Sequence, residues 1–297
     1  MSSLTDKINI HAEIQLFIRK DYLNHPFISG NKLRKLKYNL EEAKSLGINK
    51  LVTFGGPYSN HILAVACAGK TYGFETIGII RGEEFAGRTD LNPTLNDARN
   101  YGMRLRFISR QDYKRKSSED FISALVDELG ACYLLPEGGT NDLAVKGCEE
   151  ILTEDDRNYD FICCPVGTGG TISGIINSSF KNQKILGFPA LKGDFLREEI
   201  SKFARRNNWD LILDYHFGGY AKVNSELIAF LNSFNRDNNI PLDPVYTGKM
   251  MYGVHDLIHK GYFPDQSRIL VIHTGGLQGV RGMNTVLSQK GLPLIQY

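Results

Sequence analysis

The stretch DFICCPVGTGGTISG, residues 160–174, predicts a buried strand that turns through glycines into a helix. Glycine lets the backbone approach a ligand closely, and the helix that follows turns its unpaired N–H groups and the positive end of its dipole toward that ligand. Thr168, Thr171 and Ser173 add hydroxyl groups. The stretch therefore predicts a phosphate cradle.

Two better-known phosphate motifs do not fit this stretch. The dinucleotide-binding fingerprint needs a third glycine where this chain has Ile172, and a P-loop needs Lys-Ser or Lys-Thr after Gly174. A plain glycine turn is the alternative interpretation, because glycine is common where strands turn into helices.

The alternation of short apolar runs and amphipathic segments continues along the whole chain. We expect strands at residues 51–54, 76–80, 104–108, 132–135, 160–164, 185–188 and 269–273. We expect helices at residues 32–46, 60–72, 94–101, 118–129, 141–152, 194–206, 224–237, 249–260 and 277–288. Strands separated by helices predict an α/β fold with open parallel sheets covered on both faces. Ligands of such sheets bind beyond the carboxyl ends of the strands, so motifs at strand ends carry most weight.

The composition is that of an ordinary globular protein. The 297 residues are 42% hydrophobic and 23% charged, with a formal net charge of +2. This balance provides no electrostatic footprint for nucleic acid or for an anionic membrane. The start of the chain shows no signal peptide, and no apolar run approaches the ~20 residues that span a bilayer. We therefore expect a cytoplasmic protein.

The five cysteines are odd in number, and no pair has the CxxC spacing of a zinc or redox site. Cys163 and Cys164 fall in the expected strand, so we expect them to be small core side chains. No HExxH, EF-hand or GxSxG motif is present, which leaves metal and serine-hydrolase chemistry without support. We expect no metal site.

A second motif, SGNKLRK at residues 29–35, begins an amphipathic segment. Asn31 can cap the helix, which places Lys32 in its first turn. The positive end of the helix dipole lowers the pKa of an amine there, as an imine-forming lysine requires. Taken alone, this lysine could equally be a solvated one, as lysines usually are.

Three further motifs stand where strands are expected to end. TFGGPYSNH, residues 53–61, offers Ser59 and Asn60 as helix caps whose neighbouring N–H groups suit a carboxylate. His61 precedes an apolar helix and is more simply a partly buried, hydrogen-bonded histidine. PVYTGK (244–249) and IHTGG (272–276) again combine glycine with hydroxyl groups.

Two tyrosines and a threonine complete the set of candidates. Tyr246 is a candidate acid or base and Thr247 a candidate ring partner, while Tyr220 is a candidate because its loop, 214–224, is rich in glycine. Several anion-binding turns together with a lysine at a helix start indicate a phosphorylated carbonyl cofactor.

The five motifs, in this order, resemble those of the aminocyclopropane carboxylate (ACC) deaminase and D-cysteine desulfhydrase family. Its members are pyridoxal phosphate (PLP) enzymes with the fold of the tryptophan synthase β-subunit, PLP fold type II. The resemblance implies a larger PLP-binding domain from residues 1–35 and 143–297, and a smaller inserted α/β domain from residues 36–142. It also implies a small amino-acid substrate and a homodimer.

The resemblance further implies a role for each candidate residue. Lys32 would form the internal aldimine, Lys35 would help to bind the phosphate, and Asn60 would bond the pyridine hydroxyl. The implied catalytic residues are Lys32, Ser59, Tyr220 and Tyr246. The implied cofactor-binding residues are Lys32, Lys35, Asn60, Gly167, Thr168, Gly169, Gly170, Thr171 and Thr247. The implied substrate-binding residues are Ser59, Asn60 and His61.

Position 247 bears on the substrate. In the family that this chain resembles, ACC deaminases look to have glutamate at this position, and its carboxylate keeps the pyridine nitrogen protonated. This chain has Thr247 instead. A neutral ring suits β-elimination, so the resemblance favours conversion of D-cysteine to pyruvate, ammonia and sulfide. There are three alternatives. The first is ACC deamination, the second is a different lyase reaction catalysed by an enzyme of the same fold, and the third is a PLP-binding protein without catalysis. Pro57-Tyr58 and Ile62-Leu63 depart from the family pattern beside the substrate loop.

Overall fold

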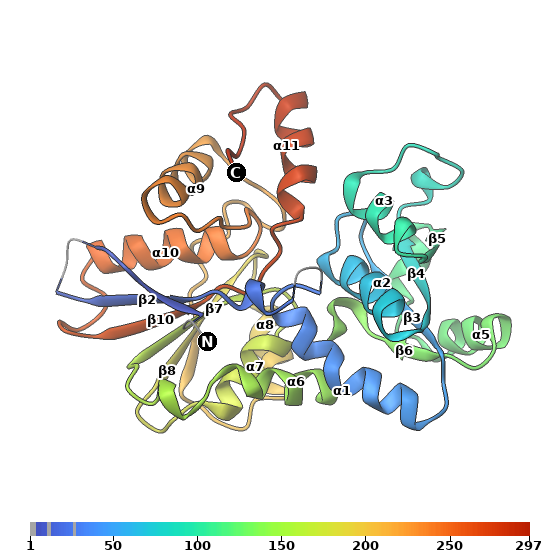
Figure 1. Cartoon of the computed structure of the whole chain (residues 1–297), viewed down its shortest axis with the longest axis horizontal. Helices are drawn as coiled ribbons and strands as arrows, with labels where there is room; N and C mark the ends of the chain where they lie inside the picture. Colours follow the sequence, from blue (N-terminus) through green and yellow to red (C-terminus); the bar gives the residue numbers. More distant parts are fainter. Residues whose placement is uncertain (1–3, 11–12, 26–27) are drawn as a thin grey trace.

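Two separate sheets organise the chain in the computed structural model, which describes residues 4–10, 13–25 and 28–297 (Figure 1). The six-stranded sheet has the order β1-β2-β10-β7-β8-β9, and the four-stranded sheet has the order β5-β4-β3-β6. The strands of the larger sheet are β1 (Thr5–Ile8), β2 (Gln15–Arg19), β7 (Phe161–Val166), β8 (Lys184–Pro189), β9 (Trp209–Leu211) and β10 (Arg268–Ile272). Those of the smaller sheet are β3 (Lys50–Gly55), β4 (Glu75–Arg81), β5 (Arg104–Ile108) and β6 (Tyr133–Leu135).

The described strands pair in parallel, with the single exception of β1 and β2. The parallel strands β3, β4, β7, β8 and β10 are buried on both faces, as their apolar runs predict. Cys163 and Cys164 in β7 are both 0% exposed, which confirms them as core side chains. The antiparallel edge strand β1 was not expected, and neither were β2 and β9.

The expected helices are all present, some of them shorter than expected. The helices are α1 (Asn31–Ser45), α2 (Asn60–Tyr72), α3 (Pro93–Asn100), α4 (Arg110–Lys114), α5 (Glu119–Leu129), α6 (Asp142–Cys148), α7 (Gly170–Ser178), α8 (Phe195–Ser201), α9 (Ser225–Asn238), α10 (Thr247–His259) and α11 (Gly279–Gln289). Among them α4 was not expected. The helix expected at 141–152 stops at Cys148 and continues as a 3-10 turn, and the one expected at 194–206 ends at Ser201.

Helix α1 lies between the two sheets (Figure 1) and contacts α6 beside the larger sheet and α2 beside the smaller one. Its apolar residues Leu36, Leu40 and Ala43 belong to one core cluster with α2, while its other face packs along α6. Both chain ends feed the larger sheet, whereas residues 50–135 build the smaller one. We therefore propose domain limits that follow the sheets, with residues 36–142 as the inserted domain.

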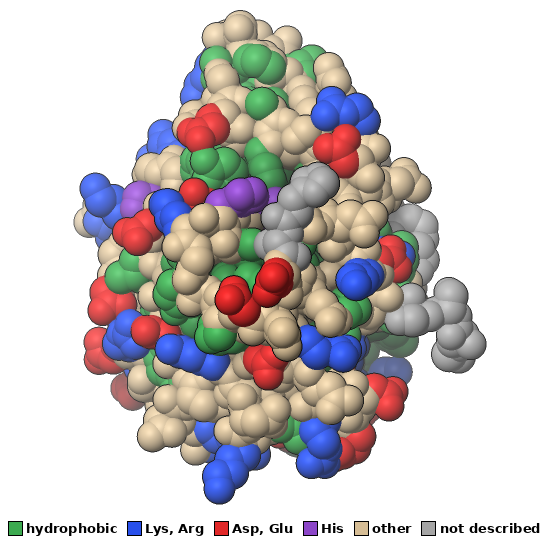
Figure 2. Space-filling model, turned by 90° about the vertical axis from the view of Figure 1, so that its left-hand side faces the viewer, with side chains coloured by type: hydrophobic (Ala, Val, Ile, Leu, Met, Phe, Trp, Pro, Cys, Tyr) green, Lys and Arg blue, Asp and Glu red, His purple; other side chains and the backbone are tan. Residues whose placement is uncertain are grey.

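The surface carries its charges in mixed order. On the face in Figure 2, lysine and arginine side chains lie among aspartate and glutamate side chains, with apolar groups scattered between them. Such mixing agrees with the near-balanced composition. No helix in the described ranges is long and apolar enough to cross a membrane.

Candidate active site

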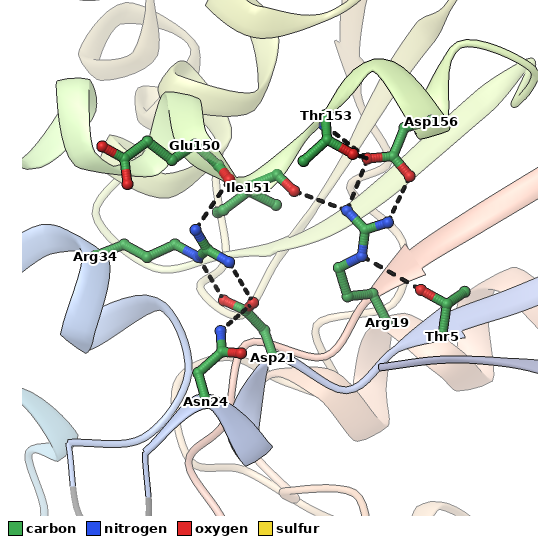
Figure 3. A network of polar contacts seen from close by, with 9 residues as sticks. All are labelled: Thr5, Arg19, Asp21, Asn24, Arg34, Glu150, Ile151, Thr153 and Asp156. Carbon is green, nitrogen blue, oxygen red and sulfur yellow. Dashed lines mark hydrogen bonds and ion pairs between the residues drawn. The ribbon is translucent and has the colours of Figure 1, made fainter. Parts of the chain in front are cut away.

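An ion-pair network fixes helix α1, which carries the candidate lysines, to the larger sheet (Figure 3). The Arg34 guanidinium donates to both carboxylate oxygens of Asp21, at 3.0 and 2.8 Å, and to the Glu150 carbonyl at 2.9 Å. Asp21 is 0% exposed, so this is a buried, bidentate pair. Nearby, Arg19 pairs with Asp156 and donates to the Ile151 carbonyl.

The start of α1 is set by a close backbone approach. Gly30 is the N-cap, with φ of 63°, and a Cβ there would lie 2.0 Å from the Thr274 carbonyl oxygen. Only glycine fits this position. The prediction that Asn31 caps the helix is wrong: its amide instead donates to the Thr171 hydroxyl at 2.7 Å, because Asn31 already lies inside the helix.

Lys32 and Lys35 lie in the first two turns of α1 and point toward the same carbonyl group. The Lys32 and Lys35 ammonium groups donate to the Gly138 carbonyl at 3.3 and 3.0 Å. Burial lowers the pKa of Lys32 well below its ordinary value, and the charge of Lys35 lowers it further. Burial likewise lowers the pKa of Lys35. Within the described ranges, neither lysine has an acidic side chain at ion-pair distance, so the two together suit an anionic ligand.

The predicted phosphate cradle, residues 167–171, lies directly beside Lys35. The Lys35 ammonium group donates to the Thr168 hydroxyl at 3.4 Å, and a Cβ on Gly170 would lie 3.2 Å from the same nitrogen. Gly169 is the N-cap of α7, with φ of 86°, and it has no side chain that could accept from the first N–H groups of the helix. Ser173 does not join the cradle, because its hydroxyl donates to the Gly169 carbonyl one turn back.

A turn that the sequence analysis missed closes the cradle from the other side. It is the 3-10 turn Glu137–Gly139, which follows β6, together with Thr140. The Thr140 hydroxyl accepts from Lys35 at 2.9 Å and lies 2.6 Å from the Thr168 hydroxyl. Its signal was present as PEGGT after an apolar run, the same strand–glycine–hydroxyl pattern as the other motifs.

The loop before α2 brings Ser59 and Asn60 to the edge of the same region. The Ser59 hydroxyl caps α2 by accepting from the Ile62 N–H, as expected. Asn60 accepts from the Gln278 amide at 3.0 Å, and a Cβ on Gly276 would lie 2.8 Å from its amide nitrogen. This loop therefore meets the 272–276 turn of the larger sheet.

His61 is enclosed behind these groups. It is 1% exposed, and its Nε2 lies 2.9 Å from the Thr53 hydroxyl. Its Nδ1 is buried without a hydrogen-bond partner in the described part of the chain. Burial and the charges of Lys32 and Lys35 lower the pKa of His61 well below its ordinary value. His61 is thus a neutral ring that forms part of the wall behind the lysines.

Two tyrosines face each other beside the cradle. The rings of Tyr220 and Tyr246 stack edge to face with centroids 6.1 Å apart, and a Cβ on Gly167 would lie 3.4 Å from the Tyr246 hydroxyl oxygen. Burial raises the pKa of Tyr246 well above its ordinary value, and Tyr220 and Asp243 raise it further. Both hydroxyl groups are therefore protonated at neutral pH.

Thr247 is engaged with a carboxylate that the sequence analysis did not single out. Its hydroxyl donates to Asp243 Oδ2 at 2.8 Å and accepts from the Asp243 N–H at 3.0 Å. Asp243 is 1% exposed and also accepts from the N–H groups of the next turn. Because the one Thr247 proton is already donated, its oxygen can offer only a lone pair to another group.

These motifs from distant parts of the chain thus meet beyond the carboxyl ends of both sheets. A family model described as pyridoxal-phosphate dependent enzyme matches residues 4–275. The chain belongs to this family of PLP-dependent enzymes. Its expected cofactor is thereby confirmed.

Two curated relatives of this PLP-dependent enzyme indicate the group of enzymes within the family to which it is similar. It is 32% identical to a Pyrococcus horikoshii protein provisionally named 1-aminocyclopropane-1-carboxylate deaminase, over 91% of this chain and 88% of that one. It is 31% identical to the mitochondrial bifunctional D-cysteine desulfhydrase/1-aminocyclopropane-1-carboxylate deaminase of Arabidopsis thaliana, over 90% of this chain and 73% of that one. The predicted resemblance to this family is therefore confirmed.

Solved structures agree on the fold. A crystal structure of an ACC deaminase homologue matches with a TM-score of 0.80 at 28% identity, over 93% of this chain and 88% of that one. An O-ureido-L-serine synthase matches with a TM-score of 0.69 at 14% identity, over 97% and 95% of the two chains, which shows the fold alone. The expected α/β fold with two parallel-sheet cores, PLP fold type II, is confirmed.

The residues of the site fit PLP. Glycines stand at several points where a Cβ would intrude into the site, including Gly138, Gly167 and Gly170. Two lysines without an acidic partner in the described ranges lie next to a helix N-terminus, which suits a phosphate dianion. Burial lowers the pKa of both, and that of Lys32 lies well below its ordinary value, as an imine-forming amine needs.

Proposed function

We propose that this PLP-dependent enzyme catalyses β-elimination from D-cysteine, giving pyruvate, ammonia and sulfide. The observation that carries the proposal is Lys32, a partly buried amine with a lowered pKa, which lies within one turn of Lys35 and shares the Gly138 carbonyl with it. When bound, PLP acts as the electron sink for a carbanion at the α-carbon of an amino acid.

We assign Lys32 to hold the cofactor covalently and then to accept the α-proton of the substrate. Burial and the charge of Lys35 lower the pKa of its amine, which favours the unprotonated form that acts as a nucleophile and a base. Lys35, Thr168 and the first N–H groups of α7 would hold the phosphate. Asn60 would orient the cofactor ring from the smaller domain.

We assign Ser59 and the start of α2 to the substrate carboxylate, because the N–H groups there favour an anion. The Tyr220 and Tyr246 hydroxyl groups are protonated and adjacent, so either can donate a proton to a departing thiolate. His61 would serve as a neutral wall, since its ring is buried against Gly139.

ACC deamination is the second candidate, and the Thr247–Asp243 hydrogen bond favours it. A hydroxyl whose proton is already donated pairs best with a protonated ring nitrogen, the state that opening a cyclopropane demands of the cofactor. In favour of D-cysteine stands the absence of an acidic side chain at position 247 itself. The Arabidopsis relative is named for both reactions.

The test is product release by the purified, PLP-loaded chain. We expect pyruvate from D-cysteine but little from L-cysteine, and no α-ketobutyrate from ACC. Release of α-ketobutyrate alone would move the assignment to ACC deamination. Lys32→Ala should abolish both turnover and the visible absorbance of the lysine-bound cofactor, and undiminished turnover in that variant would refute the assignment of Lys32.

A further inference from the structure

The loop that carries Tyr220 has a strained backbone. Phe217 and Ala221 have φ of 54° and 55°, and Gly218 and Gly219 between them have φ of 90° and 116°. Residues other than glycine are rare in this left-handed region and stay there only where the surroundings enforce it. Contacts with helix α10 provide that enforcement.

One face of α10 holds the loop at three points. The Tyr215 hydroxyl donates to Asp256 at 2.6 Å, and the Phe217 ring packs edge-on against Tyr252 with centroids 5.0 Å apart. At the N-terminal end of the same face, the Lys249 ammonium group donates to the carbonyls of His216 and Gly219, both at 2.8 Å. Positions 249, 252 and 256 follow the spacing of a single helix face.

Lys249 is an unusual residue for this place. It is 2% exposed, and it lies in the first turn of α10, where the helix dipole disfavours a cation. In the described part of the chain it forms no ion pair, and burial lowers its pKa to about 8. Burying a cation is unfavourable unless hydrogen bonds offset the loss of water. The hydrogen-bond partners of Lys249 are two backbone carbonyls of the Tyr220 loop.

The two carbonyls are the corners of the turn that leads into Tyr220. The His216 carbonyl also accepts from the Gly219 N–H at 3.0 Å, and the Gly219 carbonyl also accepts from the Lys222 N–H at 3.1 Å. Lys249 therefore ties both corners to α10, and Tyr220 is the very next residue. Tyr246 caps the same helix, so the segment 246–249 places both facing tyrosines.

We propose that Lys249 is a positioning residue that clamps the turn before Tyr220 and thereby holds the Tyr220 hydroxyl beside that of Tyr246. The clamp itself follows from the contacts above, while its effect on turnover rests on the proposed function of Tyr220.

Hydrogen exchange of the loop amides tests the clamp on the full-length, PLP-loaded protein. In Lys249→Met, a side chain of similar length that cannot donate, we expect amides of residues 217–222 to exchange at least tenfold faster than in the wild type. Tyr215→Phe is the matched control, because it removes one hydrogen bond from the other end of the same loop and should leave residues 217–222 at the wild-type rate. Unchanged exchange in Lys249→Met would overturn the proposal.

A double-mutant cycle tests whether Lys249 acts through Tyr220. The cycle compares kcat for D-cysteine in Tyr220→Phe, Lys249→Met and the double variant. If Lys249 works only by positioning Tyr220, the double variant should lie within about twofold of Tyr220→Phe. Losses that multiply would overturn the positioning role. If the wild type releases no pyruvate, the proposed function fails, and the exchange experiment still decides the clamp.

Discussion

Lys35 is a buried cation whose partners are a carbonyl and two hydroxyl groups, none of them charged. Such a group destabilises the protein without its ligand and strengthens binding of an anion. We expect Lys35→Met to leave the cofactor-free protein as stable as the wild type or more stable. The same change should raise the Kd for PLP about 10- to 100-fold, because one charge-assisted hydrogen bond contributes about 1.5–3 kcal/mol.

Lys37→Met provides the control for this prediction. Lys37 lies two residues further along α1, but its ammonium group pairs with Glu150 at the surface, 2.7 Å away. Cofactor titration by absorbance and urea unfolding measure the two effects. A Lys35→Met protein that loses several kcal/mol of stability and binds PLP normally would show that Lys35 is structural.

At this scale the sequence identified side chains with characteristic chemistry but not the backbone groups that they meet. Lys32, Ser59 and Tyr246 stood in recognisable motifs. The Gly138 carbonyl lies in the PEGGT stretch, but its position depends on φ of 68° at Gly138, which the residue types there do not specify. The role of Lys249 was hidden for the same reason, since its partners are carbonyls about 30 residues away.

Close packing of three helices at two glycines sets the position of Lys32 and Lys35. A Cβ on Gly147 of α6 would lie 2.0 Å from the Arg34 carbonyl oxygen of α1. A Cβ on Gly174 of α7 would lie 2.5 Å from Cys148 of α6. Helices α1, α6 and α7 therefore pack tightly against one another, and this packing holds Lys35 of α1 beside the phosphate cradle at the start of α7.

Gly147→Ala should push α1 away from α6. Backbone atoms cannot yield as a flexible side chain does, so we expect a loss of about 1–3 kcal/mol in the free energy of unfolding. PLP affinity should fall too, because α1 carries both lysines. Gly279→Ala is the control, since a Cβ there meets nothing closer than 3.8 Å. Urea unfolding measures the loss of stability, and cofactor titration measures the PLP affinity. A Gly147→Ala protein with the wild-type free energy of unfolding and the wild-type Kd for PLP would contradict the packing argument.

Most strands that were predicted have a continuous apolar run, whereas polar residues interrupt the run in those that were missed. The runs that became β3, β4, β7 and β10 are apolar over most of their length. Strand β2 buries only alternate residues, Leu16 and Ile18, and β9 has Asp210 at its centre, so neither produced a clear apolar run. The antiparallel pairing of β1 with β2 depends on chain return at the edge of the sheet, which local sequence does not encode.

On the scale of the whole molecule, the two sheets share one site, and contacts between their helices keep them together. Arg281 of α11 pairs with Asp97 of α3, and a Cβ on Gly282 of α11 would lie 2.9 Å from the Tyr58 ring. Pro57-Tyr58, one of the departures from the family pattern, therefore lies at the contact between the two halves. We expect this departure to affect how the halves meet more than how the cofactor binds.

The buried lysines also give the whole protein a distinctive dependence of stability on pH. In the folded protein Lys249 loses its proton near pH 8, whereas in the unfolded chain it keeps the proton up to about 10.5. Between these values the unfolded state binds more protons, so stability rises with pH. The lowered pKa values of Lys32 and Lys35 act in the same direction.

Above pH 10 the sign reverses, because burial raises the pKa of Tyr246 and Tyr113, which therefore hold protons that unfolded tyrosines release. For the cofactor-free protein we expect a gain of about 2 kcal/mol between pH 8 and 10, followed by a fall. Urea unfolding at pH 7 to 11 measures this curve, which should flatten in Lys249→Met. PLP should also flatten it, because the bound phosphate raises the pKa of Lys35 and removes its share of the gain. A free energy of unfolding that declines steadily from pH 8 would show that burial does not lower the pKa values of these lysines.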